Sequence, residues 1–174
     1  MLNSMKDMFS FNYLGIANKM IDIELRPFHG LNVKAIFLHN ILCDLCLGYE
    51  MTDVIASFDN HIRRTYAVQP AYGTLNFPQF SRFLEKCGVG SSVIMTAINK
   101  KGFYMNPGLL EYENELRQTG HTILAMATLA SGSLKPQEAY EYLAQIGVSN
   151  VVVGLSSQDH ATETFNAIKS YIGN

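Results

Sequence analysis

Short apolar runs alternate with amphipathic stretches from about residue 33 to the end of the chain. Five runs have the length and composition of strands, at 33–39, 66–72, 92–98, 122–127 and 151–153. Between them, apolar residues recur every three or four positions, which is the spacing of one helical face. This spacing predicts helices at 51–64, 76–87, 109–118, 136–146 and from 158 onward. The pattern therefore predicts a series of strands, each followed by a helix.

We expect these strands to form a parallel sheet. Their apolar residues are continuous rather than alternating, as in strands that helices cover. Three of the predicted helices end at a glycine shortly before the next strand, at Gly88, Gly120 and Gly147. Glycine suits the left-handed position that follows a helix, and repeats of about 30 residues have the size of a β–α unit. The longer polar loops then follow the carboxyl ends of the strands, where α/β folds bind their ligands.

The first part of the chain, residues 1–32, has a different pattern. It is dense in apolar residues, many of them methionine, and shows no order of strand then helix. We expect part of it to be helical and to cover an edge or the bottom of the sheet. The other interpretation is a remnant of a longer N-terminal half. The sheet-forming domain is predicted to span residues 33–174.

The composition indicates one domain with an unusually apolar surface. Of the 174 residues, 48% are hydrophobic and only 16% are charged, whereas about a quarter is the usual charged share. A net charge of −2 argues against nucleic acid or an anionic membrane as a partner. No apolar run reaches the roughly 20 residues of a membrane span, and the three cysteines are typical of a reducing compartment. We therefore expect a cytoplasmic protein whose apolar surface a partner covers.

The segment 151–160 contains the strongest candidate binding site. An apolar run stops at a glycine, and Ser156 with Asp159 has the S-x-x-D spacing of a helix cap. Unpaired N–H groups at a helix start attract anions, and the loop after the preceding strand would lie alongside. The candidate phosphate-binding residues are Gly154, Ser156 and Ser157, with Ser131, Gly132 and Ser133 from that preceding loop. Simple helix capping and turn formation are the alternative for all of them.

Two further groups of polar residues follow predicted strands. His39 ends the first strand and is a candidate acid, base or hydrogen-bond donor to a carbonyl. A structural histidine is the alternative. The loop after the 92–98 strand is a candidate substrate loop, in which a lysine would pair with an anion and a tyrosine would close over it. Its candidate residues are Asn99, Lys100, Lys101 and Tyr104. A solvated polar loop is the alternative here.

Cys43 and Cys46 form a C-x-x-C pair. A redox pair favours the start of a helix, and a zinc site needs two further ligands. The sequence has no second C-x-x-C pair and no H-x-x-H pair. We therefore expect buried thiols and predict no metal site.

Four segments together resemble the aldo-keto reductases. Residues 123–134 resemble their seventh strand and its loop, and 151–165 resemble their eighth strand and the serine-containing turn after it. Residues 36–39 resemble the fourth strand, which ends in a histidine, and 93–99 resemble the sixth, which ends in an asparagine. The resemblance covers roughly residues 33–172.

The resemblance implies an α/β fold, an incomplete (β/α) barrel of about five parallel strands with outer helices. It also implies NADP or NAD as cofactor, bound by the serine and glycine residues of the two C-terminal loops. Of the reductases' catalytic set, His39 alone has a matching position in this chain. Gln158 and Asp159 stand where family members often carry a basic residue for the 2′-phosphate.

Two functional hypotheses follow. The first is an aldo-keto-reductase-like oxidoreductase, or a relative that still binds a nicotinamide cofactor or another phosphorylated small molecule. The second is a non-catalytic interaction subunit, or a remnant of a barrel that needs a partner chain. Because a partial barrel leaves sheet edges and an inner face uncovered, we expect a homo-oligomer or a complex with another chain.

Overall fold

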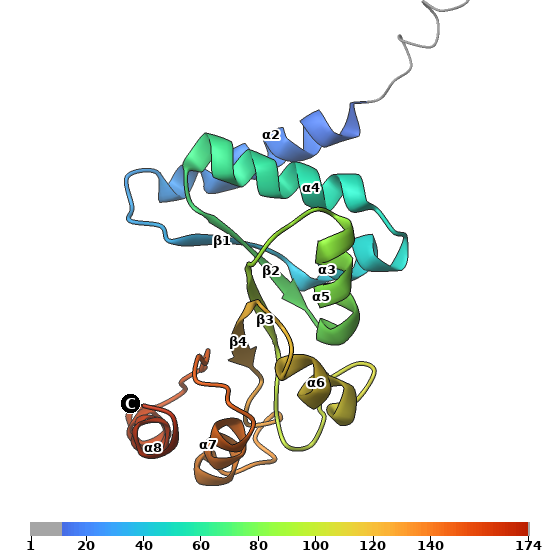
Figure 1. Cartoon of the computed structure of the whole chain (residues 1–174). Coiled ribbons are helices and arrows are strands. Elements are labelled where there is room, and N and C mark those ends of the chain that lie inside the picture. The colour runs from blue at the N-terminus through green and yellow to red at the C-terminus, as the bar shows by residue number, and fades with distance from the viewer. Residues whose placement is uncertain (1–11, 174) are drawn as a thin grey trace, which may run out of the picture.

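The computed structural model describes residues 12–173, which form a parallel sheet with helices around it (Figure 1). The strands are β1 (Ala35–Leu38), β2 (Gln69–Thr74), β3 (Val93–Ala97) and β4 (Thr122–Met126). They pair in the order β1-β2-β3-β4, and every pairing is parallel. The prediction of an α/β fold is thus confirmed, and its sheet is compatible with part of a (β/α) barrel.

Each strand is followed by at least one helix. Helix α2 (Tyr13–Leu25) and the short η1 (Arg26–Phe28) precede the sheet. The helices after β1 are α3 (Asn40–Gly48), α4 (Thr52–His61) and the π-helical turn η2 (Ile62–Tyr66). The remaining helices are α5 (Phe77–Lys86), α6 (Leu109–Leu116), α7 (Pro136–Gln145) and α8 (Gln158–Tyr171). No helix within residues 12–173 is long and apolar enough to cross a membrane.

The predicted fifth strand at 151–153 is not confirmed. Val151 makes an isolated parallel bridge to Ala125 of β4. Ala125 donates to the carbonyl of Asn150 and accepts from the N–H of Val152, each over 2.8 Å. The segment then leaves β4, and Val152 and Gly154 are exposed to solvent. A run of three apolar residues ending at a glycine is too short to extend the sheet further.

Helix α3 is an element that the sequence pattern did not predict. Ile41, Leu42 and Leu45 are exposed, whereas Cys43 and Cys46 face the core. The apolar residues of α3 therefore surround the helix instead of forming one stripe, so the three-and-four spacing does not reveal it. Helices α4 and α5, by contrast, follow the predicted spacing and bury their apolar faces.

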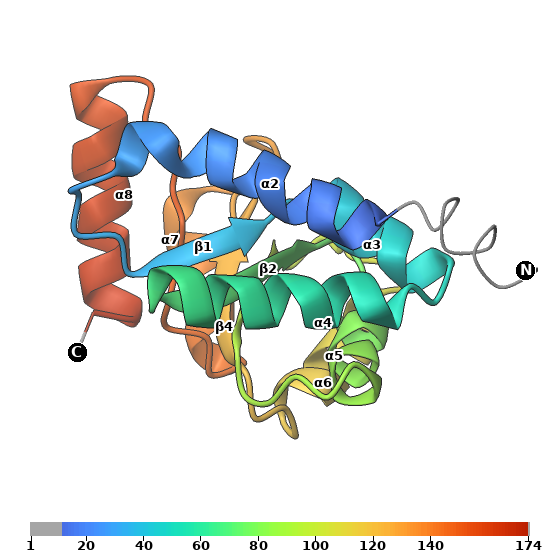
Figure 2. The same cartoon turned by 90° about the horizontal axis from the view of Figure 1, so that it is seen from above.

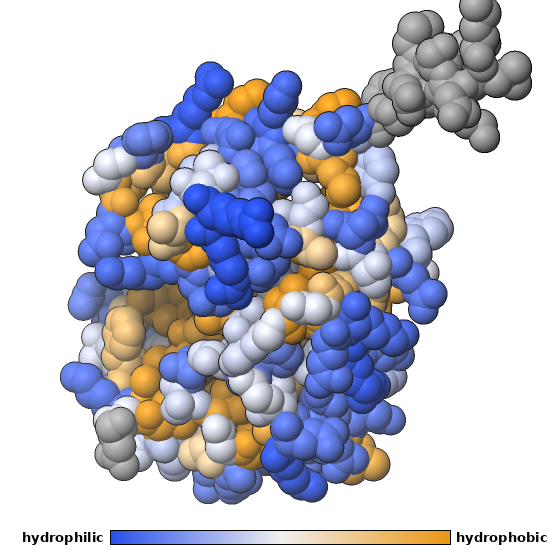
Figure 3. All heavy atoms as spheres, turned by 45° about the horizontal axis from the view of Figure 1, so that its top comes forward, coloured by the Kyte–Doolittle hydropathy of each residue, from blue (hydrophilic) through white to orange (hydrophobic). Residues whose placement is uncertain are grey.

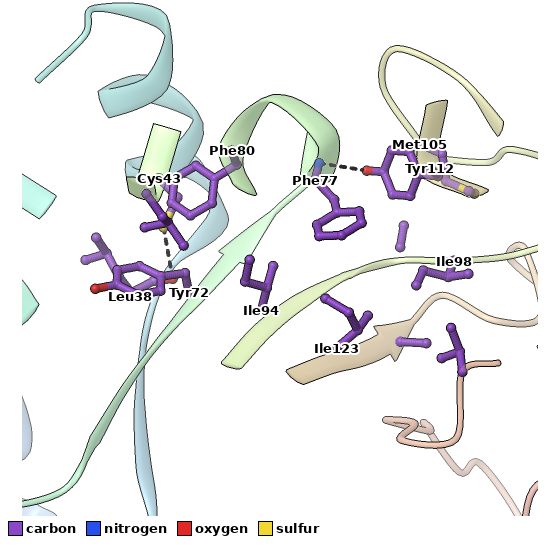
Figure 4. Close-up of a cluster of buried hydrophobic side chains, with 14 of the residues drawn as sticks. Leu38, Cys43, Tyr72, Phe77, Phe80, Ile94, Ile98, Met105, Tyr112 and Ile123 are labelled. Carbon is purple, nitrogen blue, oxygen red and sulfur yellow. Dashed lines mark hydrogen bonds between the residues drawn. The ribbon is translucent and has the colours of Figure 1, made fainter. Parts of the chain in front are cut away.

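The helices cover one face of the sheet. Tyr72 and Ile94 are direct partners in adjacent strands, and both point into the helix-covered core. Tyr72 contacts Phe58 of α4 and Phe80 of α5 through ring centroids 5.7 and 5.8 Å apart. Figure 4 shows this core, with aromatic rings from several elements around the strands.

Tyr112 is a polar centre within this core. Its buried hydroxyl donates to the carbonyl of Leu75 over 2.9 Å and accepts from the N–H of Phe77 over 3.2 Å. The second of these bonds is drawn in Figure 4. The same hydroxyl lies 3.2 Å from the hydroxyl of Thr96 in β3. One tyrosine on α6 thereby joins β3 to the loop between β2 and α5.

Two of the three predicted glycine stops have the expected backbone. Gly88 and Gly147 have φ values of +71° and +76°, in the left-handed region that a side chain disfavours. Gly120 lies outside that region. The helix before Gly120 therefore ends without the left-handed turn predicted for it.

The N-terminal segment is helical over α2, as expected for part of residues 1–32. Figure 2 shows α2 lying beside α4 at the β1 side of the sheet. Asp22 holds the contact, since its Oδ1 accepts from Tyr66 over 2.6 Å and lies 2.6 Å from Nε2 of His61. The apolar residues at 1–11 lie outside the described residues, and the boundary at 32 stays a prediction.

Candidate functional site

A small cavity lies between the loop after β4 and the segment that leads into α8. Its volume is 160 Å³. We call it the Tyr140 cavity. The residues that line it are Ala127, Thr128, Leu129, Ser131, Gly132, Tyr140, Val152, Val153, Gly154 and Thr164. The structure therefore brings Ser131, Gly132 and Gly154 together at the carboxyl end of β4, as the sequence predicted.

Tyr140 is the least expected residue of this cavity. Its side chain is fully buried, and its hydroxyl meets no partner at full hydrogen-bond geometry within the described residues. Buried polar groups almost always have a partner, and Oγ of Ser92 and Oδ1 of Asn76 share this state with Tyr140. Burial raises the pKa of Tyr140, and a weak hydrogen bond with the side chain of Thr128 offsets part of that rise. The hydroxyl is therefore protonated at neutral pH and available to donate.

Two buried threonines lie in the same cavity wall. Thr128 is 4% exposed and Thr164 is 5% exposed. Thr128 follows β4, and Thr164 belongs to the second turn of α8. Together with Tyr140 they place three hydroxyl-bearing residues, each from a different segment, in the wall of one small cavity. Hydroxyls can donate to an anion without carrying charge.

The loop between β4 and α7 has an unusual backbone. Ala127, Ala130, Ser131 and Gly132 all have positive φ values, of +51°, +46°, +57° and +81°. The left-handed conformation costs a residue with a side chain about 1 kcal/mol or more. In the described chain, the N–H groups of Ser131 and Gly132 donate to no protein acceptor. The loop therefore presents free backbone donors in a strained conformation beside the cavity.

Ser156 and Ser157 are placed differently from the prediction. Ser157, not Ser156, is the N-cap of α8, and its Oγ accepts from the N–H of His160 over 3.2 Å. Oγ of Ser156 lies 2.7 Å from Nδ1 of His160. Both hydroxyls are thus used at the helix start, and neither residue lines the cavity. The expected capping by Ser156 with Asp159 is wrong by one residue.

The hydroxyl of Ser133 is likewise hydrogen-bonded within the protein. Its hydroxyl donates to the carbonyl of Ala130 over 2.8 Å, and the residue is exposed outside the cavity. Of the six predicted phosphate-binding residues, three line the cavity and three stabilise the turns around it.

The candidate substrate loop is adjacent to this region, with Asn99 at its centre. Asn99 is 1% exposed, and its amide donates to the carbonyls of Phe103 and Ala127 over 2.9 and 3.3 Å. Its carbonyl accepts from the N–H groups of Lys101 and Phe103 over 3.2 and 2.9 Å. Both the amide nitrogen and the carbonyl oxygen of the Asn99 side chain thus make two hydrogen bonds each within the protein. Asn99 therefore shapes the loop and joins it to the end of β4.

The lysines of this loop are turned to the surface. Lys100 forms an ion pair with Glu138 on α7 over 2.9 Å. The hydrogen bond from Lys100 holds the pKa of Glu138 below its usual range, and Lys101 adds a smaller effect. Tyr104 is 61% exposed and stacks on Phe103 with ring centroids 4.0 Å apart. Lys100, Lys101 and Tyr104 are therefore exposed to solvent, and a substrate role for this loop stays a prediction.

His39 lies at the other edge of the sheet. It follows β1, while the Tyr140 cavity follows β4, and two strands separate them. His39 is exposed and serves as the N-cap of α3, where its Nδ1 accepts from the N–H of Ile41 over 3.3 Å. The structure does not bring this histidine together with the predicted phosphate-binding residues.

The cysteines are buried thiols, as expected. Cys43 and Cys46 lie in α3, and neither is in a disulfide. Burial raises the pKa of Cys43, whose Sγ donates to the carbonyl of Leu38 over 3.4 Å. Within residues 12–173, no group of three His, Cys, Asp or Glu side chains lies close enough to hold a metal ion.

The sequence reasoning missed Tyr140, Thr128 and Thr164. The ring of Tyr140 fits the apolar spacing of the predicted helix 136–146, but that spacing says nothing about the hydroxyl. A useful signal is present in the sequence: a threonine directly after a strand and another inside an apolar helical stripe. Comparisons with protein-family models, with curated proteins and with solved structures found no match for this chain.

Proposed function

We propose that this chain binds a phosphorylated small molecule, with the phosphate in the Tyr140 cavity. The observation that carries the proposal is the cavity wall, in which Tyr140, Thr128 and Thr164 come together and the buried Tyr140 hydroxyl has no partner at full hydrogen-bond geometry. An acceptor-rich ligand would supply the partner that the protein does not. Phosphate oxygens are strong acceptors, and a cavity of 160 Å³ is large enough to hold a phosphate group.

The surroundings favour an anion over a neutral ligand. The N–H groups of Ser131 and Gly132 are free, and backbone donors of this kind form anion-binding turns. Helix α8 contributes Thr164 of its second turn to the cavity wall, and the N-terminus of a helix carries about half a positive charge. The cavity wall includes no lysine or arginine. The ligand is therefore held by neutral donors and the helix dipole, so salt should weaken binding only modestly.

A nicotinamide dinucleotide is the ligand that the resemblance to aldo-keto reductases suggests. The proposal is one of binding. His39 is the only residue that matches the reductases' catalytic set, and it caps α3 at the opposite edge of the sheet. Oxidoreductase activity therefore gains no support from the geometry.

The test is the thermal unfolding midpoint of the whole chain with NADPH, NADH and inorganic phosphate. A ligand present at about 100 times its dissociation constant stabilises the native state by about 2.7 kcal/mol. For a domain of this size, that corresponds to an increase of about 5–10 °C in the midpoint. We expect an increase with at least one of the three compounds, and no increase with any of them would contradict the proposal.

Tyr142→Phe is the matched control for Tyr140→Phe. Both tyrosines are on α7, but the hydroxyl of Tyr142 donates to Glu113 over 3.0 Å and is outside the cavity. We expect Tyr140→Phe to abolish most of the ligand-induced increase and Tyr142→Phe to retain it. An equal increase in both variants would place the ligand elsewhere.

A further inference from the structure

A second cleft lies where the first three strands end. We call it the Asp44 cleft, and its volume is 760 Å³, against 160 Å³ for the Tyr140 cavity. Its walls come from α3 and the turn after it, from the residues that follow β2, from α5, and from Asn106 in the loop after β3. Figure 1 shows α3 and α5 side by side near the end of β2. In α/β folds, ligands bind at this end of the strands.

Charges of both signs line the Asp44 cleft. Its wall contains the carboxylates of Asp44 and Glu50 and the cations of Arg82 and Lys86, so the formal charges cancel. The cleft thus differs from the recess on the left of Figure 3, around which hydrophobic residues gather. A ligand that matches the cleft carries charges of both signs and no large net charge.

Asp44 is an acceptor that the protein holds in a fixed orientation. Its Oδ1 accepts from the hydroxyl of Thr74 over 2.5 Å, and its Oδ2 accepts from the N–H of Leu75 over 3.0 Å. An ionised carboxylate has about four acceptor positions, so about two remain for a ligand. Because Asp44 is partly exposed in the cleft wall, these positions suit an ammonium group.

Asn76 supplies a second acceptor in the same wall. It is the N-cap of α5, where asparagine is favoured because its side chain usually caps the helix. Here the side chain makes no capping hydrogen bond. Its Oδ1 is buried and has no hydrogen-bond partner in the described part of the chain. A donor from a ligand in the cleft would supply the missing partner.

The two cations lie on one exposed face of α5. Arg82 and Lys86 are four residues apart, so their side chains are neighbours on the helix surface. Within residues 12–173, Arg82 makes one hydrogen bond, from Nη1 to Glu115 over 3.2 Å, and most of its donors remain for a ligand. Lys86 lies 3.8 Å from Glu50, and both side chains are mostly exposed, so this ion pair is weak. Both cations can therefore bind a ligand carboxylate.

Apolar side chains complete the cleft. Leu47, Leu75 and Phe83 belong to its wall beside the charged residues. An apolar ligand side chain that packs against them is removed from water, which favours binding.

We propose that the Asp44 cleft binds a zwitterionic amino compound with an apolar side chain, as in an amino acid or a short peptide. The ammonium group binds to Asp44 and Asn76, and the carboxylate binds to Arg82 and Lys86. Each charged or unpaired group of the wall then has a partner of opposite character. This site is separate from the Tyr140 cavity, since the two share no lining residue.

The test is isothermal titration calorimetry of the whole chain with leucine and with leucyl-leucine. We expect saturable binding of at least one of them at millimolar concentration or below, and the better ligand distinguishes an amino acid site from a peptide site. The N-acetylated and the amidated form of that ligand each lack one charge and should bind at least fivefold more weakly. No saturable binding of either zwitterion would overturn the proposal, as would equal binding of a blocked form.

Asn76→Ala and Lys86→Gln test the position of the ligand. The first removes an oxygen that has no partner, and the second breaks only a weak, exposed ion pair, so both variants should fold. We expect each to bind the zwitterion at least fivefold more weakly. Lys169→Gln is the control, because Lys169 is exposed on α8 and outside the cleft. Unchanged affinity in both cleft variants, or an equal loss in the control, would overturn the proposal.

The Tyr140 variant separates the two proposed sites. Tyr140→Phe should leave the affinity for the zwitterion unchanged, whereas it should reduce the stabilisation by a phosphorylated ligand. The calorimetric result with leucine or leucyl-leucine therefore stands or fails independently of phosphate binding.

Discussion

Replacing Tyr140 by phenylalanine should make the protein more stable in the absence of ligand. Most tyrosine-to-phenylalanine changes at buried sites destabilise a protein, because a hydrogen-bonded partner is left behind. The Tyr140 hydroxyl has no partner at full hydrogen-bond geometry in the described residues. Its removal takes away the cost of a buried polar group and breaks no more than a weak hydrogen bond with Thr128.

The size of the effect follows from two terms. A buried hydroxyl without a partner costs about 1–3 kcal/mol. The oxygen atom also makes a few dispersion contacts of about 0.1–0.2 kcal/mol each, roughly 0.5 kcal/mol in total, which the variant loses. The balance is a gain of about 1 kcal/mol in the free energy of unfolding of Tyr140→Phe.

Tyr112→Phe gives the opposite sign and serves as the comparison. Both tyrosines are fully buried, but the Tyr112 hydroxyl bonds Leu75 and Phe77 and lies beside Thr96. Its removal leaves these groups without their partner and should cost about 3 kcal/mol.

Urea unfolding, followed by far-ultraviolet circular dichroism, measures both variants against the wild type. A Tyr140→Phe variant that is less stable than the wild type by more than about 1 kcal/mol would refute the reasoning, since the hydroxyl must then have a bound partner.

Three further predictions concern other parts of the chain. Asn99→Ala should lower the free energy of unfolding by about 2–3 kcal/mol because several backbone groups lose their partner; a loss below about 0.5 kcal/mol in urea unfolding would contradict this. The thiol of Cys43, whose pKa burial raises, should not react with a disulfide reagent at about pH 8 until the chain unfolds, so rapid reaction of the native protein would contradict its burial. The hydrogen bond from Tyr66, followed by that from His61, lowers the pKa of Asp22 below its ordinary 3.8. Asp22 therefore stabilises the fold above that value, and this contribution is lost as the pH falls through the lower, native pKa. Stability measured between about pH 5 and about pH 2 should fall less steeply in Asp22→Asn, and parallel curves for the two proteins would show that Asp22 contributes nothing.

The sequence pattern predicted the elements whose apolar residues form one stripe or one continuous run. The strands β3 and β4 and the helices α4, α5 and α7 are within a few residues of their predicted positions. These elements follow from periodicity, which is a local property. Helix α3 was not predicted, and the predicted strand at 151–153 is not confirmed beyond one parallel bridge. In both, the side of the chain that is buried depends on neighbours distant in sequence.

The candidate site was predicted in its location and only partly in its residues. Ser131, Gly132 and Gly154 share a cavity because the loops after adjacent parallel segments meet at one edge of the sheet. Ser156 and Ser157 were chosen for the same reason, but the start of α8 falls one residue later and uses both hydroxyls. The one-residue shift of the helix cap gives both serines contacts at the helix start, and their binding role stays a prediction.

The sequence by itself determined the α/β class and the order of most strands and helices. Hydrophobic periodicity and glycine positions carry that information because they act over a few residues. The tertiary structure decided which polar groups have partners. The poorly paired hydroxyl of Tyr140 and the saturated amide of Asn99 both depend on atoms brought together from distant segments. Hydrogen bonding and burial are properties of such assembled neighbourhoods, and no local pattern encodes them.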